Sequence, residues 1–138
     1  MKNLIVHTKK EEDLERFLNM NSFSVQELAP NVLRVQRSQE LPTFVKLGEK
    51  NIYFEVDLGS VKDLASEGFY FRLLELNTEI IPVSFGINNT NPKDPHLVLV
   101  ESREVADLDA HELLSVFDAL ELAADRAEAI FQTILDKA

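Results

Sequence analysis

The C-terminal part of the sequence, residues 109–137, has the pattern of one long amphipathic helix. Asp109 can cap its N-terminus, and Glu112 three residues later completes a capping-box pattern that satisfies two backbone N–H groups. At 1.5 Å per residue the helix spans roughly 40 Å, and neither Gly nor Pro interrupts it. Its wide apolar stripe must be covered by the rest of the chain. The stripe comprises Leu113, Phe117, Leu120, Ala124, Ala127, Phe131 and Ile134, with Val116, Ala123 and Ile130 beside it.

A shorter amphipathic helix is predicted near the N-terminus, from about residue 9 to residue 20. Thr8 and Glu11 form a second capping-box pattern at its start. Its apolar residues are spaced at i, i+3 and i+4, which places them on one face of a helix. This face is a candidate contact surface for a protein partner, through Leu14, Phe17 and Leu18.

A third helical stretch is predicted from a cap at Ser60 to Leu76, with Gly68 near its middle as a kink or a point of close backbone approach. From Gly68 onward the sequence is apolar nearly all around a helix, which indicates burial on more than one side. In a small domain one of those sides is either ordinary core or an interface with a second copy of the chain. The candidate dimer contacts are Phe69, Phe71 and Leu74.

Strand-like segments fill the remaining sequence. Along residues 51–58, apolar Ile52, Phe54 and Val56 alternate with polar or amphipathic neighbours, as in a sheet with one buried face. Turn residues separate the segments at distances typical of hairpins. The predicted strands are residues 23–28, 32–35, 43–47, 51–58, 80–87 and 96–102.

The order of these elements predicts an α+β fold. Strands joined by hairpin-length loops favour a mostly antiparallel sheet of about five to six strands. An N-terminal helix, a middle helix and the long C-terminal helix would pack on it. The length of 138 residues fits a single domain over residues 1–138, with a core large enough to be stable without disulfides.

The chain is acidic, with a net charge of −10 at pH 7. Residues 101–138 alone carry ten Asp and Glu against three Lys and Arg. Such a surface repels nucleic-acid phosphates and anionic bilayers, which argues against both as direct partners, whereas it leaves a basic protein partner open. No window is apolar enough for a membrane span, and residues 1–10 show no signal-peptide pattern, so we expect a cytoplasmic protein.

The sequence contains none of the patterns that usually mark catalytic, cofactor or metal sites. It has no cysteine and only four scattered glycines, which excludes thiolate catalysis, Cys-based zinc sites and phosphate-binding loops. His7, His96 and His111 lie far apart, and none has the i, i+4 spacing of a metal-binding pair. We therefore expect a non-enzymatic protein with no catalytic residues, no metal ligands and no cofactor.

The succession of elements resembles that of the class I type III secretion chaperones. The clearest local similarity is residues 96–113, HLVLVESREVADLDAHEL, an apolar strand that runs into an acidic loop and a capped helix. Residues 71–77, FRLLELN, similarly resemble the Leu-rich end of the middle helix in that family. The similarity covers most of residues 10–135 as pattern, with few identities. It implies a dimeric α+β chaperone or adaptor that holds a protein partner by exposed apolar surface.

A second resemblance keeps other functions open. Residues 41–52, LPTFVKLGEKNI, are similar to the YjfI-like family, whose members share this fold and are associated with phage-shock-type membrane-remodelling proteins. This similarity implies, as an alternative, a regulatory subunit of such a system. Another alternative is a small-molecule hydrolase in which His96 or His111 meets two carboxylates in a deep polar pocket.

Overall fold

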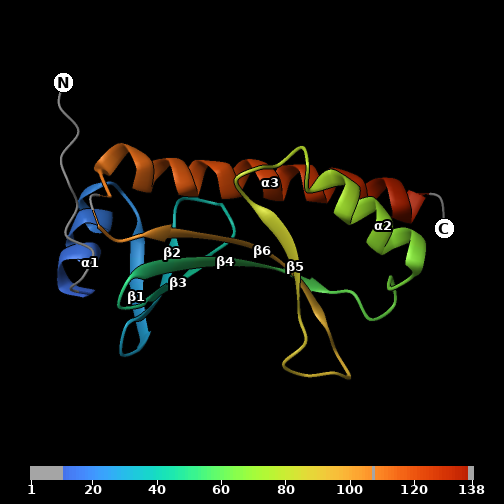
Figure 1. The fold of residues 1–138 in the computed structure, drawn as a ribbon, viewed down its shortest axis with the longest axis horizontal. Coiled ribbons are helices and arrows are strands. Elements are labelled where there is room, and N and C mark those ends of the chain that lie inside the picture. The colour runs from blue at the N-terminus through green and yellow to red at the C-terminus, as the bar shows by residue number, and fades with distance from the viewer. Residues whose placement is uncertain (1–10, 107, 137–138) are drawn as a thin grey trace.

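The computed structural model describes residues 11–106 and 108–136, which form three helices and six strands in the predicted order (Figure 1). The predicted α+β fold is confirmed. The helices are α1 (Glu11–Met20), α2 (Glu67–Leu76) and α3 (Ala110–Asp136). The strands are β1 (Ser24–Ala29), β2 (Val32–Gln36), β3 (Thr43–Leu47), β4 (Asn51–Ser60), β5 (Ser84–Asn88) and β6 (His96–Glu104).

The six strands make one antiparallel sheet in the order β1-β2-β3-β4-β6-β5. The first four strands follow one another as hairpins. β6 then pairs with β4, and β5 lies on the outer side of β6. The segment that contains α2 and β5 therefore separates β4 from β6 in the sequence, although these two strands are neighbours in the sheet. Consequently β1 and β5 are the edges of the sheet, and the longest strands, β4 and β6, lie side by side.

The main core lies between the sheet and α3, which runs along one face of the sheet (Figure 1). The predicted alternation in β4 is confirmed, because Ile52, Phe54 and Val56 are all buried. From α3, Phe117 meets the Phe54 ring edge-on at 5.6 Å between centroids. The predicted cap of α3 is also present, since the Asp109 carboxylate accepts a hydrogen bond of 2.8 Å from the backbone N–H of Glu112.

A smaller apolar cluster joins α2 to the C-terminal half of α3. Phe69 of α2 stacks on Phe131 of α3 with 6.2 Å between ring centroids. The cluster also contains Leu73 of α2, Leu97 of β6, and Val61 from the turn after β4. Figure 1 shows α2 lying beside the end of α3, beyond the end of the sheet that is opposite α1.

The predicted start of the middle helix is wrong. Ser60 is the last residue of β4, and α2 begins only at Glu67, where the Ser66 hydroxyl accepts a hydrogen bond of 3.1 Å from the backbone N–H of Phe69. The reason is tertiary, because Val61 is buried and its N–H donates to the Pro95 carbonyl at 3.0 Å, which holds this segment as a turn. Gly68 therefore lies in the first turn of α2 and makes no kink.

The strand predicted for residues 80–87 starts later, at Ser84. Ile80 and Val83 are buried, but they belong to a turn in which the Val83 N–H donates to the Ile80 carbonyl at 2.9 Å. Pro82 within this turn has no N–H for a strand ladder. Thr8 and residues 9–10 of the predicted first helix lie outside the described residues, as do Lys137 and the side chain of Ile134. Among the described residues, no helix combines the length and apolarity needed to cross a membrane.

Candidate partner-binding surfaces

The apolar face of α1 is largely used by the core. Leu14 and Leu18 are completely buried, and Phe17 is half-buried beside them. The expectation of an exposed strip here is therefore wrong for Leu14 and Leu18, because a short amphipathic helix must cover its apolar face with the adjoining sheet. A contact between Phe17 and a partner stays a prediction. Met20, at the end of α1, is the exposed apolar residue nearest to it in the chain.

The three residues predicted for a dimer contact separate onto opposite sides of α2. Phe69 is 6% exposed and belongs to the smaller core cluster. Phe71 and Leu74 are 68% and 67% exposed. The helical period explains the division, since Phe69, Leu73 and Leu76 share one face, whereas Phe71 and Leu74 lie about half a turn away from it. α2 thus presents two large apolar side chains, one turn apart, to solvent.

A second group of exposed apolar side chains lies where the α2–β5 connection crosses α3. Ile81 and Leu122 are both exposed and line the same small hollow of about 100 Å³. Arg126 of α3 holds the connection in place, with its guanidinium 3.7 Å from the Glu79 carboxylate and hydrogen-bonded to the Glu79 carbonyl at 3.3 Å. Sequence periodicity could not find this group, because Ile81 lies in a turn.

The face of the sheet opposite α3 carries an open hollow of about 590 Å³. Figure 1 shows this face without a covering helix in the described part of the chain. Its floor combines Phe44, Tyr53 and Val100 with Lys46 and Glu55. Partial burial, and then the neighbouring Asp57 charge, raise the pKa of Glu55 above its usual value. The alternation in β4 already predicted that Tyr53 and Glu55 face away from the core, but the hollow itself comes from strands that meet only in the sheet.

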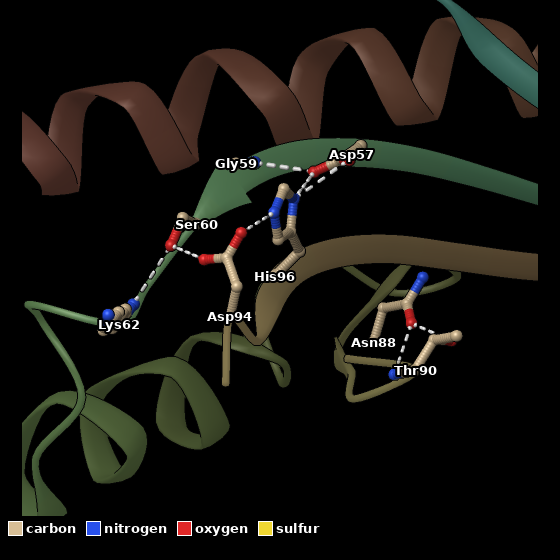
Figure 2. Close-up of polar contacts among 8 residues, drawn as sticks. All are labelled: Asp57, Gly59, Ser60, Lys62, Asn88, Thr90, Asp94 and His96. Carbon is tan, nitrogen blue, oxygen red and sulfur yellow. Dashed lines mark hydrogen bonds and ion pairs between the residues drawn. The ribbon is translucent and has the colours of Figure 1, made fainter. Parts of the chain in front are cut away.

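A polar cluster stands at the end of the β4–β6 pair, around His96 (Figure 2). Nδ1 of His96 lies 3.0 and 3.1 Å from the two carboxylate oxygens of Asp57, and Nε2 lies 3.1 Å from Asp94. Asp57 also accepts a hydrogen bond of 2.8 Å from the Gly59 N–H, and Ser60 donates its hydroxyl to Asp94.

The chemistry of this cluster is that of an ion-pair clamp. A neutral imidazole has a single N–H, so two carboxylates facing both ring nitrogens favour the doubly protonated cation. The hydrogen bonds that His96 donates to Asp57 and then to Asp94 raise the pKa of His96, while the hydrogen bonds that Asp94 accepts from Ser60 and then from His96 lower the pKa of Asp94. Two acids do flank His96, as the hydrolase alternative requires. However, both ring nitrogens are engaged, and neither His96 nor His111 lines a principal hollow of the described residues.

Metal ligation was not expected from the sequence. Among residues 11–106 and 108–136, no group of three or more His, Asp or Glu side chains has the geometry to hold a metal ion. In the His96 cluster, the two carboxylates lie on opposite ring nitrogens and therefore do not converge on one point. His7 lies outside the described residues.

These features define a small α+β fold whose surface carries exposed apolar patches and shallow hollows, a form suited to contact with another protein. The chain belongs to the CesT_Tir_1 family, a family of type III secretion chaperones, because the family model matches residues 7–134. The resemblance to the class I secretion chaperones is thereby confirmed. No curated protein matches the sequence significantly.

Two solved structures share the fold. One is a chain of the heterodimeric ExoU–SpcU complex from the type III secretion system of Pseudomonas aeruginosa, with a TM-score of 0.65 and 21% identity. The match covers 82% of this chain and 93% of that one. The other is YbjN, a proposed transcription regulator from E. coli, with a TM-score of 0.62, 14% identity, and coverage of 93% and 96%. At these identities the similarity concerns the fold alone.

Proposed function

We propose that this protein is a non-enzymatic, cytoplasmic chaperone or adaptor that binds a protein partner and works as a homodimer. In this proposal residues 1–138 form a single domain. Membership of the secretion-chaperone family supports the binding role. The observation that carries the dimer is the pair Phe71 and Leu74, two large apolar side chains that point away from the core of their own chain.

In this proposal the exposed side of α2 is the twofold interface, with Phe71 and Leu74 at its centre. Burying a Phe or Leu side chain contributes about 1.5–3 kcal/mol, and a twofold contact would bury this pair from both copies. The ion pair between Arg72 and Glu75, with 2.7 Å between its closest atoms, flanks the apolar pair and supplies a polar rim. Phe69 supports the same helix from inside, where its stacking on Phe131 fixes α2 against α3.

A charge placed on the α2 surface tests the dimer. We expect light scattering to give twice the chain mass of 15.7 kDa for the unaltered protein. Phe71→Glu or Leu74→Glu should give a folded monomer, because the exposed site accepts a charge in the monomer but not in an interface. Leu28→Glu, at an exposed apolar residue of β1, is the matched control and should remain dimeric. A monomeric unaltered protein at micromolar concentration would contradict the proposal.

Capture of partners tests the binding role. The tagged protein, incubated with its native cytosol, should retain one protein in a constant ratio, and the purified pair should reassemble from its separate components. If the retained partner is a membrane-remodelling protein, the regulatory-subunit alternative is favoured. If no protein reassembles with the chain, but a small molecule is turned over by it, the chaperone proposal fails and the hydrolase alternative gains support.

A further inference from the structure

Helix α3 carries the same acidic pair twice along one face. Asp118 and Glu121 form the first pair, and Asp125 and Glu128 form the second. Within each pair the residues are three apart, so that they are neighbours on the helix surface. The two pairs are seven residues apart, a spacing that returns to nearly the same face after two turns.

The first pair is occupied by an arginine of the same chain. Nη2 of Arg37 lies 2.6 Å from the Asp118 carboxylate and 2.6 Å from the Glu121 carboxylate, and its Nε donates to Glu121 at 3.0 Å. The guanidinium also lies over the Phe23 ring, 4.9 Å from its centroid. Two carboxylates and an aromatic ring therefore make an arginine site in this fold.

The second pair has the same components but no arginine from the described residues. Asp125 and Glu128 are both exposed, and neither forms an ion pair within residues 11–106 and 108–136. They border a hollow of about 460 Å³ between α3 and the loop that carries Arg37. Leu41, which is 48% exposed, and the ring of Phe131 both line this hollow. The full lining is Gln39, Glu40, Leu41, Leu58, Ala124, Asp125, Glu128 and Phe131.

We propose that this hollow docks an arginine-bearing apolar segment of the protein partner, with the guanidinium between Asp125 and Glu128 and an adjoining apolar side chain against Leu41 and Phe131. The inference rests on the proposed protein-binding function. Charge complementarity supports this occupant, because three carboxylates line the hollow of a chain whose net charge is −10. The planar guanidinium can bond two carboxylates at once, whereas the ammonium of lysine acts as a single point charge.

A short peptide tests the proposal without knowledge of the partner. The probe is acetyl-Leu-Arg-Leu-amide, titrated into the full-length protein while backbone amide shifts are followed by NMR. The comparison peptide replaces Arg with citrulline, which keeps the shape and removes the charge. We expect shifts at Leu41, Ala124, Asp125 and Glu128 with the arginine peptide, and binding about tenfold weaker with citrulline. Raising the salt concentration should weaken binding of the arginine peptide but not binding of the citrulline peptide.

Paired variants locate the site. The double variant Asp125→Asn, Glu128→Gln should bind the arginine peptide about tenfold more weakly than the unaltered protein does. Glu49→Gln combined with Glu104→Gln removes the same charge at the opposite end of β4 and should leave binding unchanged. Equal binding of the citrulline peptide, shifts outside the hollow, or no shifts at millimolar peptide would each overturn the arginine site. An identified partner that reassembles equally well with both double variants would also overturn it and leave the chaperone proposal standing. If no partner reassembles with the unaltered chain, the chaperone proposal itself fails.

Discussion

Arg37 and Glu121 are joined by two hydrogen bonds, from Nε to one carboxylate oxygen at 3.0 Å and from Nη2 to the other at 2.6 Å. The contact links the segment after β2 to the middle of α3, 84 residues further along the chain. The hydrogen bonds to Glu121 and then to Asp118 raise the pKa of Arg37 further above its already high value, so the guanidinium keeps its positive charge. It helps to fix how α3 sits along the sheet.

Loss of Arg37 should weaken the fold measurably. We expect Arg37→Ala to lower the free energy of unfolding by about 1–2 kcal/mol, since a bidentate ion pair and a contact with the Phe23 ring are both lost. Arg37→Lys should recover only part of this, because lysine cannot bond both oxygens of Glu121 in the same way. Urea unfolding measures both variants. The control is Arg16→Ala, at an exposed pair of 4.0 Å, which should cost less than about 0.5 kcal/mol.

Phe69 and Phe71 should respond oppositely to truncation, although only one residue separates them. Phe69→Ala removes a ring from the cluster with Phe131 and should destabilise the fold by about 3 kcal/mol. Phe71→Ala should change the free energy of unfolding of the dissociated chain by about 0.5 kcal/mol or less, because the Phe71 ring is exposed and packs little against the core. Unfolding measured at submicromolar concentration compares the two. Equal losses would show that the exposed side of α2 is packed within the monomer.

The His96 clamp should make stability depend on pH in a defined window. The raised pKa of His96 means that its contribution is complete below about pH 6.5 and is lost as the pH rises through the folded-state value. The lowered pKa of Asp94 means that its contribution is complete above about pH 3.9 and is lost on further acidification. The clamp should therefore stabilise the fold most between about pH 4 and 6.5.

NMR titration of the imidazole protons tests the clamp directly. His96 should titrate above the value of an unperturbed histidine. Asp57→Asn should lower its pKa, because the hydrogen bond to Asp57 raises the pKa of His96 more than the hydrogen bond to Asp94 does. A pKa of His96 below that of an unperturbed histidine would contradict the clamp.

Glu101 should oppose folding when it is ionised. It is buried, one carboxylate oxygen has no hydrogen-bond partner within the described residues, and the other accepts from Arg103 at 2.7 Å and 3.0 Å. Burial raises the pKa of Glu101 despite the opposing effect of Arg103. Its stabilising contribution, present below about pH 4.3, is therefore lost as the pH rises through the folded-state value.

Replacement by a neutral isostere tests this sign. Glu101→Gln should raise the melting temperature at pH 8, and the difference from the unaltered protein should narrow towards pH 4. The matched control is Glu104→Gln, at an exposed residue of the same strand, which should leave the melting temperature nearly unchanged. A lower melting temperature for Glu101→Gln at pH 8 would mean that the ion pair with Arg103 outweighs the cost of burial.

The elements with strong local signals were predicted well. The stripe of α3, its Asp109 cap and the alternation in β4 are local patterns, and each appears in the fold. The boundaries that failed depend on distant residues. Val61 lies in a turn because its N–H donates a hydrogen bond to the Pro95 carbonyl. No pattern within residues 60–76 carries that information.

The candidate surfaces show the same division. Apolar spacing marked Leu14 and Leu18 as one face of a helix, but it could not say that the sheet covers that face completely. It grouped Phe69 with Phe71, although the packing of α3 makes one of them core and leaves the other exposed. Periodicity gives the direction of a side chain relative to its own helix, and only the neighbouring element decides whether that direction is buried.

By itself, the sequence determined the fold class, the order of elements and the long C-terminal helix, because capping and hydrophobic periodicity act over a few residues. The tertiary structure alone decided the partnership of Arg37 with Asp118 and Glu121, the meeting of His96 with Asp57, and the hollow beside Asp125 and Glu128. Each joins segments far apart in the chain. The physical reason is that such contacts depend on strand register and on where α3 lies across the sheet, and the packed core as a whole sets both.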